Sequence, residues 1–235
     1  MDSLTLQKTQ VQVRVNSFVR SVYNWMAIGL GITGIVAYSV ANLPEVRNVI
    51  FGSGIVFFGL IIAQLVLVFM MSARIYRMQA GTATLLFLLY SALNGTTLSS
   101  IFLAYAQSSI TSTFFVCSAT FVACSVYGWT TRRDLTSMGG FLTMGLIGIV
   151  IASLVNLFIQ SSAVSTIVSY IGVLVFVGLT AYDTQDIKNM AMAQPADIDG
   201  GAVRKGAILG ALKLYLDFIN LFLMLLRIFG SSREE

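Results

Sequence analysis

The sequence predicts an all-α membrane protein, a bundle of seven transmembrane helices. Of its 235 residues, 57% are hydrophobic and only 10% are charged, whereas soluble domains carry about 25% charged residues. The mean hydropathy is +0.85. Seven apolar runs each approach the roughly 20 residues that a helix needs to cross a bilayer. The connections between them are short, so we expect one compact bundle whose partner is the lipid bilayer.

The chain begins with a polar segment and then alternates between apolar runs and short loops. Residues 1–20 lack the small-residue cleavage site of a signal peptide. We predict a cytoplasmic N-terminal segment over residues 1–20 and the seven-helix domain over residues 21–235. The predicted spans are, in order, Tyr23–Leu43, Gly52–Met71, Thr82–Ala104, Ser112–Thr130, Met138–Phe158, Val164–Asp183 and Ile208–Phe229.

Basic residues in the loops predict how the chain is oriented. With the N-terminus inside, ten basic residues fall on the inner side and three on the outer side, which is the bias of cytoplasmic loops. This spread over short loops is typical of topology determinants, so the net charge of +4 does not indicate a nucleic-acid partner. The C-terminus is outside if the seventh run crosses and inside if it re-enters; the full length of the run favours crossing. The inner set is Lys8, Arg14, Arg20, Arg74, Arg77, Arg132, Arg133, Lys188, Arg204 and Lys205, and the outer set is Arg47, Arg227 and Arg233.

Small residues recur within the spans, where they allow helix backbones to approach closely. Gly31 and Gly34 lie in the first span, and Gly145 and Gly148 lie in the fifth. We predict that these glycines serve helix packing.

The chain contains no histidine. This excludes catalysis by histidine-dependent serine or cysteine nucleophiles and metal sites with histidine ligands. A response to pH near neutrality must then come from carboxylates rather than from imidazole. We expect no enzymatic activity and no bound cofactor.

Two carboxylates lie in or at the end of predicted spans. Asp183 ends the sixth run, and Asp217 lies ten residues into the seventh. A carboxylate at membrane depth costs about 2.5–3.5 kcal/mol on insertion scales and is a functional hypothesis by default. Helix tilt, or early unwinding of the sixth helix, could bring the two together. The two carboxyl groups would then share a proton when one of them is protonated, and they would offer a Ca²⁺ site when both are ionised.

Two simpler interpretations of these acids remain open. Asp183 could be a solvated residue at the end of its span. Asp217 could form a purely structural ion pair with Lys213, four residues earlier.

Other polar residues in the spans are candidate lining or gating groups. Asn220 and Arg227 lie on roughly the same face of the last helix as Asp217, and Arg227 could pair with Glu45 or hydrogen-bond Gln64. Tyr90, Asn94 and Thr97 form a stripe on the third run, which serves either helix association or pore lining.

Arg74 and Arg77 lie at the inner end of the second run. They are candidates to hold Asp183 through a salt bridge, a contact that we call the latch. The commoner alternative is that they are topology charges.

Two stretches resemble a known family. Residues 181–185, AYDTQ, resemble the signature of the Bax-inhibitor-motif membrane proteins. Residues 214–222, LYLDFINLF, continuing to Leu226-Arg227 and Phe229-Gly230, resemble the last helix of the same family. The number of apolar runs and the chain length agree, so the chain is identified as resembling a bacterial inner-membrane member.

The resemblance implies a seven-helix fold with the last helix in the centre. It also implies a pH-sensitive calcium leak, in which Asp183 and Asp217 form a hydrogen-bonded dyad and a basic residue, Arg74 or Arg77, latches it. Bacterial members can carry an acid in the second span that pairs with the arginine matching Arg227, where this chain offers only Gln64. Some relatives regulate membrane proteases instead.

Three functions compete on this basis. The favoured one is a cation leak channel or transporter gated by Asp183 and Asp217, with calcium as the ion. A second is a non-catalytic modulator that binds a membrane protease or another membrane partner. An intramembrane aspartyl protease is disfavoured, because Asp217 has no neighbouring glycine of the Gly-x-Gly-Asp type.

Overall fold

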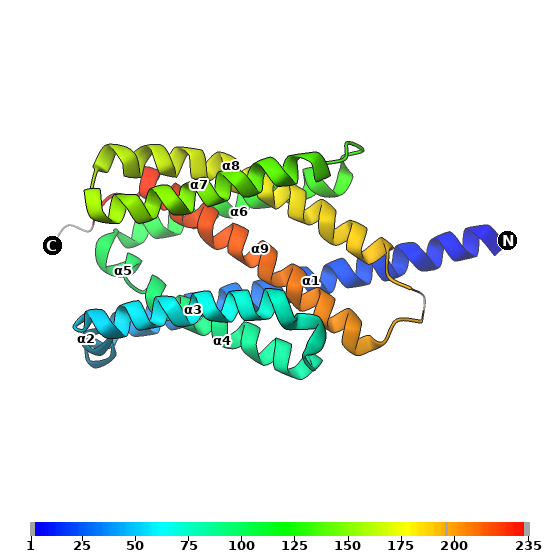
Figure 1. Ribbon diagram of the computed structural model, residues 1–235, viewed down its shortest axis with the longest axis horizontal. Coiled ribbons are helices and arrows are strands. Elements are labelled where there is room, and N and C mark those ends of the chain that lie inside the picture. Colours follow the sequence, from blue (N-terminus) through cyan, green and yellow to red (C-terminus); the bar gives the residue numbers. More distant parts are fainter. Residues whose placement is uncertain (1–2, 196, 233–235) are drawn as a thin grey trace. The chain divides into compact units, whose positions relative to one another are not determined.

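The computed structural model describes residues 3–195 and 197–232, and every named element over these residues is a helix (Figure 1). Seven of the described helices are long and apolar enough to cross a membrane. The prediction of an all-α, seven-span protein is therefore confirmed. The elements are α1 (Ser3–Asn42), α2 (Pro44–Phe51), α3 (Gly54–Arg74), η1 (Ile75–Arg77), α4 (Ala80–Leu98), α5 (Ile101–Ala104), α6 (Gln107–Thr130), α7 (Thr136–Ile159), α8 (Ser162–Met192) and α9 (Gly200–Phe229).

Two short helices, α2 and α5, were not predicted. Helix α2 occupies the first connection, where Pro44 stands at the first helical position, which suits the fixed φ of proline. Helix α5 arises because the third predicted run breaks at a serine pair. The Ser99 and Ser100 hydroxyls donate to Thr96 O at 2.7 Å and to Thr97 O at 2.9 Å. Such bonds back to the helix backbone are a recognised cause of a bend.

The last two spans are longer than hydropathy predicted. Helix α8 continues from Asp183 to Met192, and α9 begins at Gly200 rather than at Ile208. The polar end of α8 still carries a buried stripe, with Ile187 1% and Ala191 6% exposed, and this stripe keeps it helical. Unwinding of the sixth span at Asp183, one of the two ways expected to bring the acids together, does not occur.

The chain divides into two compact units, which we describe separately. Unit 1 comprises Met1–Ala104 and Ala191–Tyr215, and unit 2 comprises Tyr105–Met190 and Leu216–Glu235. Helix α9 therefore gives its first half to unit 1 and its second half to unit 2.

The core of unit 1 is built on close contact between α1 and α4. A Cβ placed on Gly29 would lie 2.7 Å from Phe87 Cζ, and one on Gly95 would lie 2.6 Å from Thr33 O. The predicted packing glycines of the first span, Gly31 and Gly34, have no such neighbour. The packing face is that of Gly29, because two residues further along a helix is about 200° around its axis.

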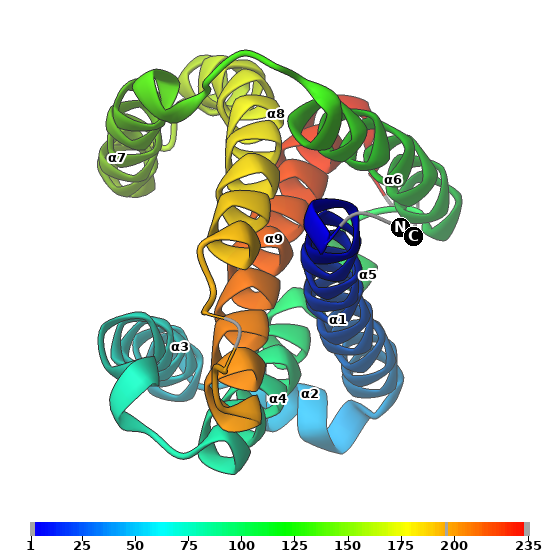
Figure 2. The same cartoon turned by 90° about the vertical axis from the view of Figure 1, so that its right-hand side faces the viewer.

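Unit 2 contains α6, α7, α8 and the second half of α9, and its helices also meet at glycines. A Cβ on Gly128 of α6 would lie 2.2 Å from Ala181 O of α8, and one on Gly145 of α7 would lie 2.9 Å from Val175 Cγ2. The packing role predicted for Gly145 is confirmed, whereas Gly148 has nothing within 4 Å. Within unit 2, α8 lies beside the second half of α9 (Figure 2), and Gly172 of α8 lies against the Met224 side chain.

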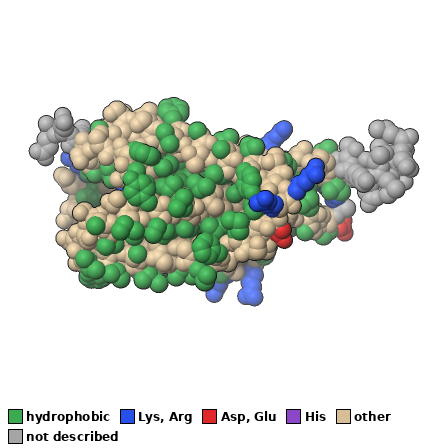
Figure 3. Space-filling model, turned by 90° about the horizontal axis from the view of Figure 1, so that it is seen from above, with side chains coloured by type: hydrophobic (Ala, Val, Ile, Leu, Met, Phe, Trp, Pro, Cys, Tyr) green, Lys and Arg blue, Asp and Glu red, His purple; other side chains and the backbone are tan. Residues whose placement is uncertain are grey.

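Helix α9 is the most enclosed of the seven candidate spans. In its apolar window 72% of the residues are buried, against 39% or less in each of the other spans. A central last helix would be buried to this degree, and its place among the other helices stays a prediction. The spans α3 and α7 are the least buried, at 6% and 11%, and the face drawn in Figure 3 carries mostly hydrophobic and uncharged side chains. Such a surface is suited to lipid.

Contacts at the helix ends agree with the predicted topology. In unit 1, Lys205 Nζ donates to Tyr76 O at 3.1 Å, which joins two connections that were both predicted on the inner side. In unit 2, Ala106 N donates to Ser231 O at 3.1 Å, so the end of α9 meets a connection that was predicted outside. These contacts agree with a last helix that crosses the membrane, and both the crossing and the orientation of the N-terminus stay predictions.

Candidate functional site

The two acids singled out from the sequence lie in the same unit. Asp183 on α8 and Asp217 on α9 both belong to unit 2, and they are only 9% and 5% exposed. Burial of this degree argues against Asp183 as a solvated residue at a span end. It also agrees with the rule that acids within spans face the protein interior.

Four residues of the AYDTQ segment surround Asp183 with structural contacts. The backbone of Ala181 meets Gly128 of α6, and the Tyr182 ring occupies the space above Gly139 of α7, where a Cβ would lie 2.6 Å from Tyr182 Cζ. Thr184, 1% exposed, donates its hydroxyl hydrogen to Thr180 O at 2.7 Å. The segment thus fixes α8 against two neighbouring helices, and Asp183 is held at that junction.

Gln185, the last residue of the segment, joins α8 to the connection between α6 and α7. Its Nε2 donates to Arg133 O at 2.9 Å, and its Oε1 accepts from Leu135 N at 2.8 Å. This residue was not selected from the sequence. The signal that could have found it is a glutamine in the last turns of an apolar span, since a buried amide must be satisfied on both its atoms.

One turn further along α8, Lys188 closes the end of α6. Its Nζ donates to Trp129 O at 2.8 Å and lies 5.3 Å from the centre of the Trp129 ring. A lysine at the C-terminal end of a helix satisfies a carbonyl there and is favourable to the helix dipole.

The neighbour of Asp217, Phe218, anchors α9 in unit 2. Its ring centre lies 5.7 Å from that of Phe114 and 5.4 Å from that of Phe121, both on α6. The Cys117 thiol contacts Phe218 O at 3.7 Å. These contacts set the rotation of α9 and therefore the direction in which Asp217 leaves the helix.

The polar candidates on α9 have different surroundings. Asn220 is half-buried, and its Nδ2 donates to Leu216 O of its own helix at 2.8 Å. Arg227 is exposed and lines a cavity of about 390 Å³ in unit 2, together with Tyr105 and Asn156. Their roles in lining and gating stay predictions.

The remaining candidates belong to unit 1. Asn94 is buried, and its backbone carbonyl oxygen accepts a hydrogen bond from the Thr97 hydroxyl at 3.0 Å. Gln64 Nε2 donates to Leu93 O at 3.2 Å, so this amide already serves contact between α3 and α4. Arg74 and Arg77 are both exposed, so the latch stays a prediction and exposure favours neither arginine.

Tyr215, two residues before Asp217, organises the interior of unit 1 and was also missed. Its side chain is fully buried, and its hydroxyl lies 2.6 Å from Thr33 Oγ1. Its ring makes edge contacts with Phe87 and Tyr90, with centres 5.9 Å apart in both cases. The tyrosine of LYLDF thus serves packing and a buried hydrogen bond.

Comparison with known proteins gives the family of the chain. The family model described as "Inhibitor of apoptosis-promoting Bax1" matches residues 15–234. The chain belongs to the Bax inhibitor family. Within this family, it is 53% identical over 235 residues to inner membrane protein YbhL of Escherichia coli strain K12, an alignment that covers 99% of this chain and 100% of YbhL.

Two further relatives support the assignment. A protein of Borreliella burgdorferi is 45% identical over 235 residues, covering 100% of both chains. Protein RP147 of Rickettsia prowazekii is 46% identical over 219 residues, covering 92% of this chain and 90% of RP147. The chain is therefore an integral membrane protein of the Bax inhibitor family.

Proposed function

We propose that this Bax inhibitor family protein is a pH-sensitive leak channel or transporter for calcium, gated by Asp183 and Asp217. The single observation that supports the proposal is the burial of both carboxylates, 9% and 5% exposed, on spans of the same unit. Charged groups in that setting are costly, so their protonation depends strongly on what surrounds them. This provides a proton-responsive element in a chain without histidine.

The proposed mechanism uses the two protonation states differently. When both acids are ionised, their oxygens are suited to a hard divalent cation such as Ca²⁺. When one is protonated, the pair shares a proton, and a latch from Arg74 or Arg77 would lose its charged partner. Acid therefore opens the latch and also removes cation ligands. Because these two effects on ion flux oppose each other, the mechanism does not fix the pH at which flux is largest. The test therefore asks whether flux depends on pH at all.

The experiment is Ca²⁺ flux into proteoliposomes between pH 5 and 8, with wild type, Asp183→Asn and Asp217→Asn. We expect flux in the wild type that varies with pH, and loss of this dependence in both variants. Asp134→Asn is the matched control, because Asp134 is exposed and lies outside the spans of the same unit, and the amide retains the oxygen that accepts from Thr136 N.

Two results would contradict the proposal. One is a wild type without flux above empty liposomes at any pH, which would favour a modulator of a membrane protease or another partner. The other is an unchanged pH profile in Asp217→Asn.

A further inference from the structure

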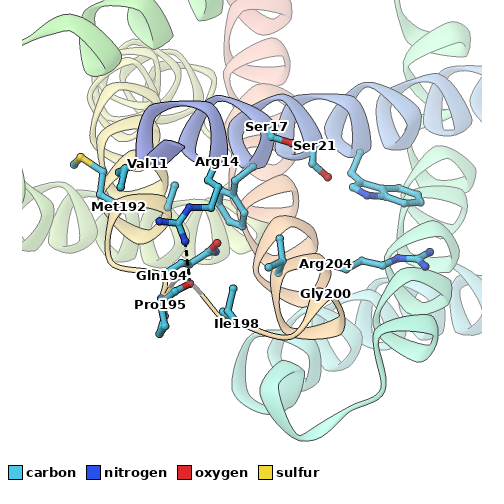
Figure 4. A pocket seen from close by; sticks show the side chains of 14 residues that line it. Val11, Arg14, Ser17, Ser21, Met192, Gln194, Pro195, Ile198, Gly200 and Arg204 are labelled. Carbon is cyan, nitrogen blue, oxygen red and sulfur yellow. Dashed lines mark hydrogen bonds between the residues drawn. The ribbon is translucent and has the colours of Figure 1, made fainter. Parts of the chain in front are cut away.

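Unit 1 contains a cavity that the proposed function does not use. It has a volume of about 450 Å³ and lies between α1, the connection from α8 to α9 and the start of α9 (Figure 4). Its walls include Phe18, which is buried, and the half-buried residues Val11 and Ile198. The cavity is thus partly apolar.

The charges lining the cavity are all positive. Arg14 and Arg204 line it, and no acidic residue does so among the described part of the chain. Arg14 Nη1 donates to Pro195 O at 3.4 Å, which uses one of the five N–H donors of a guanidinium. The Arg204 guanidinium lies 5.5 Å from the centre of the Trp25 ring, another lining residue. Each arginine is held in place and still exposed.

Two acidic residues, Asp197 and Asp199, belong to the connection from α8 to α9, and neither lines the cavity. Asp199 Oδ2 accepts from Ala202 N at 3.1 Å and so caps the first turn of α9. This carboxylate satisfies one N–H group at the start of α9, and the charges on the cavity wall are those of the two arginines.

The position of the cavity indicates the kind of anion. Arg14 lies near the start of the first candidate span, Gln10–Asn42, in the unbroken helix α1, and Trp25 is of the type that gathers at membrane–water interfaces. The bias of basic residues predicts that this part of the chain lies on the cytoplasmic side, and basic pockets between transmembrane helices on that side are typical sites for anionic lipid headgroups. A free phosphate has no apolar part to contact the apolar walls, whereas a phospholipid does.

We propose that this cavity binds the phosphodiester headgroup of an anionic glycerophospholipid, with Arg14 and Arg204 as the recognising groups. Phosphatidylglycerol is the probe. The apolar walls would contact the glycerol backbone and the first part of the acyl chains. This site is separate from the carboxylates of unit 2 and does not depend on the proposed ion flux.

The sequence provides its own reporter. The chain has two tryptophans, so Trp129→Phe leaves Trp25, in the cavity wall, as the only one. The full-length Trp129→Phe protein is placed in vesicles, and quenching of Trp25 by brominated phosphatidylglycerol is compared with quenching by brominated phosphatidylcholine. Each arginine near an anionic surface strengthens binding about fivefold. We expect a relative binding constant on the order of 10 or more, falling to about 1 in Arg14→Gln/Arg204→Gln.

A matched double variant separates the cavity from general surface charge. Arg20→Gln/Arg77→Gln removes the same charge from exposed positions of unit 1 that do not line the cavity, and it should keep the preference. Quenching by brominated phosphatidylcholine in every variant shows that the protein is folded and inserted. An absent preference in the Trp129→Phe protein with intact arginines, or an equal loss in both double variants, overturns the proposal.

The source of the phosphate is tested separately. Excess inorganic phosphate is added to the Trp129→Phe protein, with both arginines intact, and compared with chloride at equal ionic strength. We expect the lipid preference to respond equally to the two salts. If phosphate alone abolishes it, the cavity binds free phosphate and the assignment to lipid is wrong.

Discussion

Replacing Gln185 by leucine should release the connection between α6 and α7. The change removes the acceptor for Leu135 N and the donor to Arg133 O, at 2.8 and 2.9 Å. A buried donor left unsatisfied costs about 1–3 kcal/mol, and an ordinary hydrogen bond contributes about 1 kcal/mol. Local opening of this connection should therefore become easier by about 2–4 kcal/mol, which is roughly a 30- to 700-fold rise in the open population.

Limited trypsin digestion measures that opening directly. Arg132 and Arg133 are exposed and lie within the connection, so cleavage there reports the open state when opening is fast relative to cleavage. Cleavage after Arg77, in unit 1, is an internal reference that should not change. Gln107→Leu is the matched control, because Gln107 is exposed and also belongs to unit 2. Equal cleavage rates at Arg132 in Gln185→Leu and wild type would refute the reasoning.

Two further predictions concern unit 2. Gly128→Ala should destabilise the protein by about 1–3 kcal/mol, because the new Cβ would lie 2.2 Å from Ala181 O. A Cβ at Gly148 meets nothing within 4 Å, so Gly148→Ala should be neutral or slightly stabilising. The melting temperatures of the two variants in detergent test this difference. Hydrogen bonds from Thr136 lower the pKa of the Asp134 carboxyl, so the stabilisation is present at pH 7 and lost as the pH falls through that lowered pKa. Asp134→Ala should lower the melting temperature at pH 7 and have no effect below that pKa, and an unchanged difference across the titration would contradict this.

The spans could be predicted because lipid imposes one simple requirement on them. About 20 apolar residues are needed for each crossing, and hydropathy detects that directly. The polar end of α8 and the polar start of α9 could not be found this way, because they are held by contacts between distant residues. Lys205 with Tyr76 O, and Lys188 with Trp129 O, are such contacts. No local sequence pattern predicts these contacts.

The two acids of the site could be predicted from the sequence, whereas the residues that pack around them could not. An acid within an apolar run stands out because its burial is costly, and both Asp183 and Asp217 are indeed buried. The glycine face of α1 was assigned to the wrong residues, since composition does not say which side of a helix meets its neighbour. Gly29, and not Gly31, faces Phe87.

The AYDTQ segment shows why a family motif does not by itself establish a gate. Ala181, Tyr182, Thr184 and Gln185 each have a packing or hydrogen-bonding contact within unit 2, so packing alone could account for four of its five residues. Asp183 is different, because a carboxylate is a costly choice for filling a position that is 9% exposed. Asp183→Asn therefore tests the gate while it leaves the other four contacts in place. Gln185→Leu removes the hydrogen bonds to the connection between α6 and α7 and leaves Asp183 in place. The first variant should therefore change ion flux, and the second should change local stability.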